Sequence, residues 1–133
     1  MSFRKTASSE LEIELQKIAA KHGFTPKVIW NEGLEFEMEM IDAPCLANVY
    51  GENAQHIPFW IWDQIIHILT VLYEHEGIEY IDITPYNFIE KDNKIWLIDF
   101  GHAFYTKSPN KPENWFLREL LIDGVCAWNP DFK

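Results

Sequence analysis

The alternation of apolar and polar positions predicts two amphipathic helices. In the first, over residues 10–22, the apolar positions are Leu11, Leu15, Ile18 and Ala19. In the second, over residues 57–77, they are Ile61, Ile65, Ile68, Leu69 and Leu72. Both sets recur every three or four residues, the spacing that places side chains on one face of an α-helix. Pro58 suits the first turn of the second helix, and Gly77 ends it.

Of two glutamates in the first helix, one is predicted to cap the start of the helix and the other to face the core. Ser9 and Glu12 have the spacing of a capping box, which would occupy Glu12 at the start of the helix. Glu14 lies three residues after Leu11 and four before Ile18, so it falls on the apolar stripe. Because a carboxylate that faces the core needs a partner, we expect Glu14 to pair with a cation.

Strand-forming residues follow each helix. The segments KVIW (27–30) and LEFEMEMI (34–41) flank Asn31-Glu32-Gly33, which predicts an antiparallel hairpin with one apolar and one acidic face. A second hairpin is predicted from strands at 88–90 and 95–98 around the polar turn 91–94. Residues 115–121 are expected to form a short helix, and residues 127–133 an irregular tail.

Composition narrows the class of protein. The chain has 133 residues, of which 47% are hydrophobic and 15% aromatic, enough for the core of one domain. No apolar run approaches the roughly 20 residues that cross a bilayer, so we expect a cytoplasmic protein that does not contact a membrane. The net charge of −10, without a stripe of Lys and Arg, argues against binding to nucleic acid. Cys45 and Cys126 show no metal-binding spacing and are expected to be reduced and structural.

The stretch YIDITPYNFIEKDNKIWLIDFG, residues 80–101, carries three oxygen-bearing side chains around the second hairpin. Asp82 and Asn87 precede the hairpin, and Asp99 follows it, directly before Phe100-Gly101. Mg²⁺ prefers hard oxygen ligands, and an amide and a carboxylate suffice when phosphate and water complete the coordination. A carboxylate that is not on the metal can orient an attacking hydroxyl. The pattern favours a metal-phosphate site over the alternative, in which these residues merely cap turns.

These motifs resemble those of the protein-kinase-like superfamily, including its small prokaryotic and viral kinases and the aminoglycoside-phosphotransferase-like group. Residues 80–88 are similar to the catalytic loop of the family, and residues 98–101 to its metal-binding loop. Upstream, residues 10–28 are similar to the small-lobe helix and the strand after it, and residues 38–41 resemble the gatekeeper and the hinge. The resemblance covers about residues 10–101.

The resemblance implies an α+β fold in a single domain over residues 1–133. A reduced N-terminal lobe, made of a sheet, one helix and the hinge at its end, would occupy about residues 1–41. A truncated helical C-terminal lobe that carries the catalytic hairpins would occupy residues 42–133. Asp82 would be the catalytic base, and Asn87 and Asp99 would hold Mg²⁺.

The resemblance also implies an ATP site. Beside Met38, the backbone of Glu39 and Ile41 would contact adenine, and Glu14 would be the glutamate of the small-lobe helix. Lys5, in SFRK, is the sole candidate for the lysine of the family's third strand. Its separation of nine residues from Glu14 is short, and a solvated terminal lysine is the alternative.

The chain departs from the family pattern at several places. It contains no G-x-G-x-x-G, nine residues precede the first helix, and 32 residues follow Gly101 without an A-P-E motif. Tyr80 and Ile81 stand where histidine and arginine are common, and Thr84 where protein kinases usually have a lysine. We therefore expect poor neutralisation of charge in the transition state, and weak or absent phosphotransfer unless a partner chain supplies the missing parts.

Two functions stay open from the sequence. One is a minimal ATP-Mg²⁺ phosphotransferase that acts on a hydroxyl of a protein or a small molecule. The other is a degenerate pseudokinase that binds a protein partner. Oligomerisation is left open as well. His102 is expected to be a loop residue packed beside Phe104. Four aromatic residues near the C-terminus would either close the core or mark a partner surface; they are Trp115, Phe116, Trp128 and Phe132.

Overall fold

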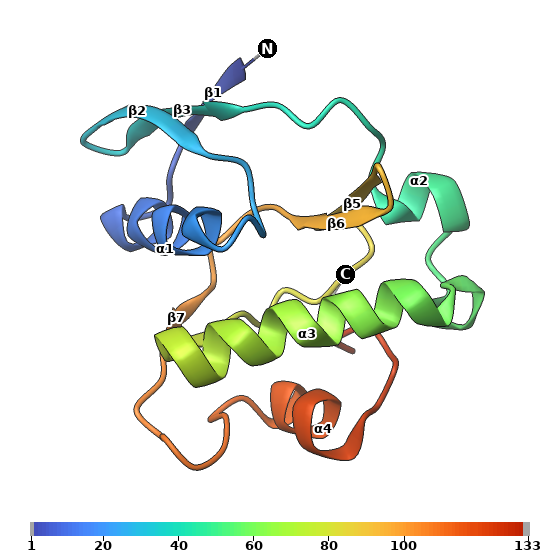
Figure 1. Cartoon of the computed structure of the whole chain (residues 1–133). Helices are drawn as coiled ribbons and strands as arrows, with labels where there is room; N and C mark the ends of the chain where they lie inside the picture. Colours follow the sequence, from blue (N-terminus) through green and yellow to red (C-terminus); the bar gives the residue numbers. More distant parts are fainter. Residues whose placement is uncertain (1, 132–133) are drawn as a thin grey trace.

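A computed structural model describes residues 2–131 of the chain (Figure 1). Its N-terminal part is a three-stranded antiparallel sheet with the order β1-β3-β2, packed on one helix. The strands are β1 (Ser2–Thr6), β2 (Val28–Glu32) and β3 (Glu35–Glu39), and the helix is α1 (Glu10–Lys21).

The C-terminal part is built around a long helix, α3 (Phe59–Glu76), which runs across the molecule below the N-terminal part (Figure 1). Before it come α2 (Leu46–Tyr50) and a short 3₁₀ helix, η1 (Ala54–His56). After it come β4 (Ile78–Glu79), β5 (Phe88–Lys91), β6 (Lys94–Leu97), β7 (Phe104–Tyr105) and α4 (Trp115–Asp123). Strand β4 pairs with β7 and β5 with β6, both antiparallel. The division of the chain at residue 41 stays a prediction.

The predicted helices and the second hairpin are confirmed within a few residues. Gly77 ends α3 in a left-handed conformation with φ 67°. Asp92 and Asn93, with φ 56° and 62°, form the two-residue turn between β5 and β6. Positive φ at both positions is typical of a type I′ turn, whose twist matches that of the flanking strands.

The first hairpin turns two residues later than predicted. Asn31 and Glu32 belong to β2, and Glu32 pairs with Glu35, so the turn consists of Gly33 and Leu34. Gly33 has φ 59°, which glycine adopts without a steric penalty. The predicted apolar face is confirmed for Phe36 and Met38, which are buried, whereas Leu34 is exposed.

One large hydrophobic core joins the two parts. The apolar face of α3 packs against the segment 78–88 and against Leu15 and Ala19 of α1. A smaller cluster lies between α1 and the sheet and consists of Ala7, Ile13, Phe36 and Met38. Because α1 contributes to both clusters, it fixes the sheet relative to α3.

The aromatic residues near the C-terminus divide between core and surface. Trp128 lies 4.6 Å from the ring of Trp62 and closes the core together with Phe116. Trp115 is 43% exposed, and Phe132 lies outside the described residues.

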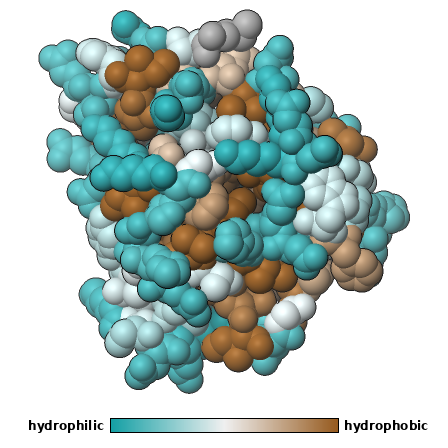
Figure 2. Space-filling model, in the orientation of Figure 1, coloured by the Kyte–Doolittle hydropathy of each residue, from teal (hydrophilic) through white to brown (hydrophobic). Residues whose placement is uncertain are grey.

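The face shown in Figure 2 is largely hydrophilic, with apolar residues in separate spots. Among residues 2–131, no helix combines the length and the apolar character that crossing a bilayer requires.

The C-terminal segment holds the loop that follows β4. The backbone N–H of Asn129 donates to the Ile83 carbonyl at 2.9 Å, and its side-chain Nδ2 donates to the Ile81 carbonyl at 2.8 Å. Asn129 is 8% exposed. The two carbonyls stand on either side of Asp82, so this one buried residue fixes the backbone at Asp82 through its backbone N–H and its side chain.

Replacing Asn129→Leu should lower the free energy of unfolding by roughly 1–3 kcal/mol, because two hydrogen bonds of the Asn129 amide are lost: its Nδ2 no longer donates to the Ile81 carbonyl, and its Oδ1 no longer accepts from the Asp131 N–H. Urea unfolding measures this difference. The matched control is Asn110→Leu at an exposed position, which should change stability by less than about 0.5 kcal/mol. Equal effects of the two substitutions would show that the Asn129 side chain does not stabilise the backbone at Asp82.

Candidate functional site

The hairpin β5–β6 brings Asn87 and Asp99 together. The pairing of Phe88 with Leu97 places the residues before β5 and after β6 at one end of the ladder. The Ile98 N–H donates to the Asn87 carbonyl at 2.9 Å and extends the ladder by one step. Asn87 Nδ2 in turn donates to the backbone carbonyl of Asp82 at 2.9 Å. The predicted meeting of Asn87 and Asp99 at one edge is confirmed.

The donor atoms of Asn87 and Asp99 fit a magnesium ion. The side-chain nitrogen of Asn87 donates to the Asp82 carbonyl, and the amide oxygen has no partner among residues 2–131. Oδ1 of Asp99 accepts from the Gly101 N–H at 3.0 Å, while Oδ2 has no partner among the described residues. Within residues 2–131, no cluster of three or more His, Cys, Asp or Glu forms a metal site by itself. A cation bound here would therefore need phosphate and water as further ligands, as Mg²⁺ often does.

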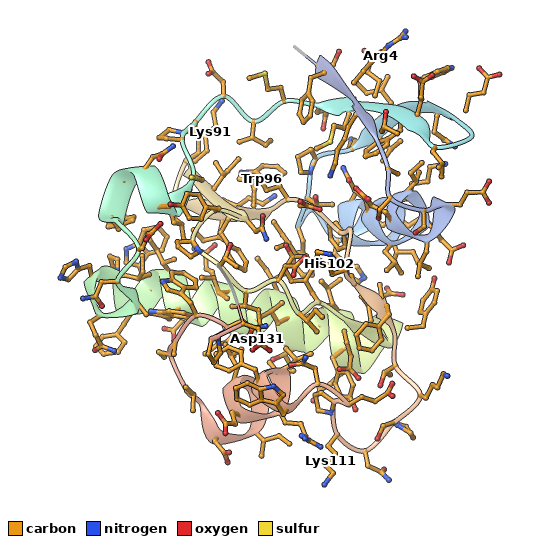
Figure 3. The ribbon with its side chains drawn as sticks, turned by 180° about the vertical axis from the view of Figure 1, so that it is seen from behind. Arg4, Lys91, Trp96, His102, Lys111 and Asp131 are labelled. Atoms are coloured by element: carbon orange, nitrogen blue, oxygen red, sulfur yellow. The ribbon has the colours of Figure 1, made fainter. Side chains whose placement is uncertain are left out.

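Two cavities of about 390 Å³ each meet at Asn87 and Asp99. The volume of each lies in the range of small-molecule sites. The first, which we call the apolar cavity, lies between the sheet and β5; besides Lys5 it is lined chiefly by Phe3, Met38, Met40, Ile41, Ile89 and Ile98. The second, the polar cavity, is lined chiefly by Asp82, Thr84, His102, Asn114, Asn129 and Asp131. Figure 3 shows His102 and Asp131 between the N-terminal part and α4.

Lys5 joins the N-terminal sheet to this site. It lies on β1, opposite Phe36 of β3, so it is a strand residue and not a solvated terminal lysine. Its Nζ lies 2.8 Å from Glu12 Oε2 and 3.5 Å from Asp99 Oδ1. One ammonium group thus connects β1, α1 and the loop after β6.

Glu12, and not Glu14, faces the core. Glu12 is 2% exposed, and its Oε1 accepts from the backbone N–H and the hydroxyl of Ser8 at 2.9 and 3.0 Å. The Ser9 side chain makes no N-cap hydrogen bond, so the predicted capping box with Glu12 is not formed. Glu14 is exposed and accepts a hydrogen bond from the Tyr105 hydroxyl at 2.5 Å, which raises the pKa of Tyr105 to about 12.

Glu14 was predicted to face the core with Leu11 and Ile18. This prediction is wrong, because α1 buries a different face from the one that the apolar residues of the sequence indicated. That face consists of Glu12, Ile13, Leu15, Gln16 and Ala19, whereas Leu11 and Ile18 are half-buried at its border. Glu12 lies three residues before Leu15 and four before Gln16, so it shares their side of the helix.

The hinge predicted at residues 38–41 lines the apolar cavity. Met38 is buried in β3, and Glu39 and Ile41 stand at the cavity wall. The Glu39 N–H donates to the Lys27 carbonyl at 2.9 Å, and the Ala43 N–H donates to the Ile41 carbonyl at 2.9 Å. The Ile41 N–H has no acceptor among the described residues, so this group is free to bind a ligand.

His102 contacts Asp82, a contact that the sequence did not predict. Its Nδ1 lies 2.7 Å from Asp82 Oδ2, and its side chain is 75% exposed, so the predicted packing beside Phe104 is wrong. The hydrogen bond and the charge of Asp82 raise the pKa of His102 above its ordinary value of 6.5. The two residues are twenty positions apart, and no local spacing pattern relates them.

Comparison with known structures shows the fold. The kinase PK-1 of the Cydia pomonella granulovirus superposes with a TM-score of 0.61 at 13% identity, over 86% of this chain and 45% of the kinase. Rv3197 of Mycobacterium tuberculosis, in its complex with erythromycin, superposes with a TM-score of 0.58 at 22% identity, over 72% of this chain and 26% of that protein. The chain thus spans less than half of each protein, and the predicted α+β kinase-like fold is confirmed.

A family comparison agrees with the structural one. The model of the RIO domain matches residues 2–119, which include Lys5, Glu12, Asp82, Asn87 and Asp99. The match covers most of the chain. The protein therefore belongs to the RIO domain family, within the protein-kinase-like superfamily.

Proposed function

We propose that this RIO domain binds ATP with Mg²⁺ and transfers the γ-phosphoryl group to a hydroxyl, with Asp82 as the base. The observation that carries the proposal is that Asn87 and Asp99 line both cavities. A nucleotide in the apolar cavity would have its phosphates at these two residues, and an acceptor in the polar cavity would reach the same point from the other side.

The apolar cavity supplies the contacts that an adenine ring needs. Met38, Met40 and Ile89 provide apolar walls, and the Ile41 N–H, which has no acceptor among residues 2–131, can donate to a ring nitrogen. Lys5 also lines this cavity, and its Nζ lies 3.5 Å from Asp99 Oδ1. Its positive charge would face the phosphates, and its ion pair with Glu12 holds it there.

Asn87 and Asp99 would hold Mg²⁺ through the amide oxygen and Oδ2. When bound, the ion would neutralise negative charge on the phosphates. Asp82 would accept the hydroxyl proton while the hydroxyl oxygen bonds to the γ-phosphorus and the bond from that phosphorus to the ADP oxygen breaks. The acceptor would be a hydroxyl of a protein or a small molecule.

A binding module without turnover is the second candidate function. The observation that favours it is the exposure of Phe59 and Val49, which are 80% and 51% exposed and are available to a protein partner. This function requires the fold and no proton transfer, so a test of turnover separates the two candidates.

Mg²⁺-ATP should raise the melting temperature, because a ligand that binds only the folded state stabilises it. Asp99→Asn should abolish this rise, since the substitution replaces a carboxylate oxygen with an amide at the metal. Asp63→Asn, at an exposed position on α3, is the control and should keep the full rise. If millimolar Mg²⁺-ATP does not raise the melting temperature of the wild type, the proposed binding is wrong.

Glu12→Gln should weaken the binding of Mg²⁺-ATP by roughly ten-fold, because Lys5 loses the charge that holds it beside the phosphates. Glu14→Gln is the matched control on the same helix and should leave the affinity unchanged. Calorimetric titration measures both. Equal losses in the two variants, or a loss in Glu14→Gln alone, would show that Glu12 does not orient Lys5.

Asp82→Asn should slow the release or transfer of labelled γ-phosphate from ATP by roughly 100-fold, because the amide cannot accept the proton. Binding of Mg²⁺-ATP should persist, which a thermal-shift measurement checks. Equal rates in wild type and variant would remove Asp82 from the mechanism, and nucleotide binding without turnover would support the binding module.

A further inference from the structure

We propose that His102 is a positioning residue for Asp82. Its Nδ1 holds Oδ2 of the carboxylate and leaves Oδ1 to the acceptor hydroxyl. This inference rests on the proposed function, because it concerns the same base.

The backbone of Asp82 is fixed, but its side chain is held at one point only. Asn87 and Asn129 bind the backbone carbonyls of Asp82, Ile81 and Ile83. Among residues 2–131, His102 is the one residue that bonds to the carboxylate of Asp82. Without this bond the carboxylate would rotate between rotamers, and a base that samples several orientations spends less time aligned with a hydroxyl.

The position of His102 is itself fixed from both sides. Before it, Phe100 is buried and its ring lies 5.3 Å from that of Tyr80. The Ala103 N–H donates to the Phe100 carbonyl at 3.2 Å, which closes a tight turn with His102 at its corner. After it, β7 pairs with β4, with Phe104 opposite Glu79. The imidazole therefore leaves a rigid turn whose two ends are anchored in the core and in a strand pair.

The charges around His102 are mostly negative. Asp82 bonds to it, Asp99 and Glu12 act on it from the loop after β6 and from α1, and Asp131 lines the same cavity. Lys5 is paired with two of these carboxylates, Glu12 and Asp99. The hydrogen bond to Asp82 and the charges of Asp82, Asp99 and Glu12 raise the pKa of His102, so the ring carries a proton below that pKa and is neutral above it.

The protonation state should affect Asp82. An imidazolium next to the carboxylate lowers the affinity of Asp82 for the proton of the acceptor, whereas a neutral ring still holds Oδ2 through its Nδ1–H. The rate should therefore rise with pH through the pKa of His102, above 6.5.

Replacing His102 with Asn or Gln tests this role, because their carboxamide side chains can form hydrogen bonds but do not ionise. The amide nitrogen of Asn can take the place of Nδ1, whereas that of Gln reaches to the place of Nε2. In His102→Asn, kcat for release of labelled phosphate from Mg²⁺-ATP should stay within roughly three-fold of the wild type, without the rise with pH. In His102→Gln and His102→Ala, kcat should fall by roughly ten-fold with an unchanged KM for Mg²⁺-ATP. His75→Gln, at an exposed position on α3, is the control and should behave as the wild type.

An NMR titration of the His102 ring in the nucleotide-free protein tests the contact without turnover. The pKa should lie above 6.5 in the wild type and fall toward that value in Asp82→Asn. Equal pKa values in the two proteins would overturn the proposal.

The kinetic outcomes separate the two proposals. If wild type and Asp82→Asn release phosphate at the same rate, the phosphotransfer function fails, and the role of His102 fails with it. If the wild type is faster than Asp82→Asn, but His102→Asn and His102→Gln show equal kcat values, only the role of His102 is overturned.

Discussion

The ion pair between Lys5 and Glu12 is the interaction on which the arrangement of the two parts depends. Glu12 is almost completely buried, its Oε1 is satisfied by Ser8, and the charge on Oε2 is met by the Lys5 ammonium 2.8 Å away. Removing one partner from a buried pair leaves an uncompensated charge, which typically costs about 3–5 kcal/mol. Because Lys5 also reaches Asp99, the same pair fixes the sheet and α1 relative to the loop after β6.

In the loop after β6, Asp99 has a backbone conformation that residues other than glycine rarely adopt. Asp99 has φ 67°, and its Oδ1 accepts from the Gly101 N–H, which offsets part of the strain. A Cβ at Gly101 would come within 3.2 Å of Asp99 Oδ1 and 3.5 Å of Glu12 Oε1. Glycine at this position therefore allows the loop and α1 to approach each other. In this conformation Oδ1 of Asp99 faces Lys5, and Oδ2 has no partner among the described residues.

The sequence predicted the parts of this fold that depend on near neighbours. Helix α3 and the hairpin β5–β6 have strong local signals, and the spacing of Asn87 and Asp99 across that hairpin follows from its register. Strand β1 was not predicted, because it is short and mostly polar and forms through pairing with β3. Glu14 was chosen over Glu12 because a helix that buries side chains against both a sheet and a second helix has no single stripe to read. The contacts of His102 and Asn129 join residues 20 and 48 positions apart, and only the tertiary structure shows them.

The contact of Asn129 also bears on how the site is divided along the chain. The family match ends at residue 119, yet Asn129 fixes the carbonyls on both sides of Asp82 and lines the polar cavity. The apolar cavity, which we propose to take the nucleotide, is lined by residues of the sheet, of the hairpin β5–β6 and of the segments next to them, all within the matched residues. The polar cavity, which we propose to take the acceptor, includes Asn129 and Asp131, which lie beyond the matched residues. Because Asn87 and Asp99 belong to both cavities, variation in the last residues can reshape the acceptor side while the groups proposed to hold ATP and Mg²⁺ stay in place.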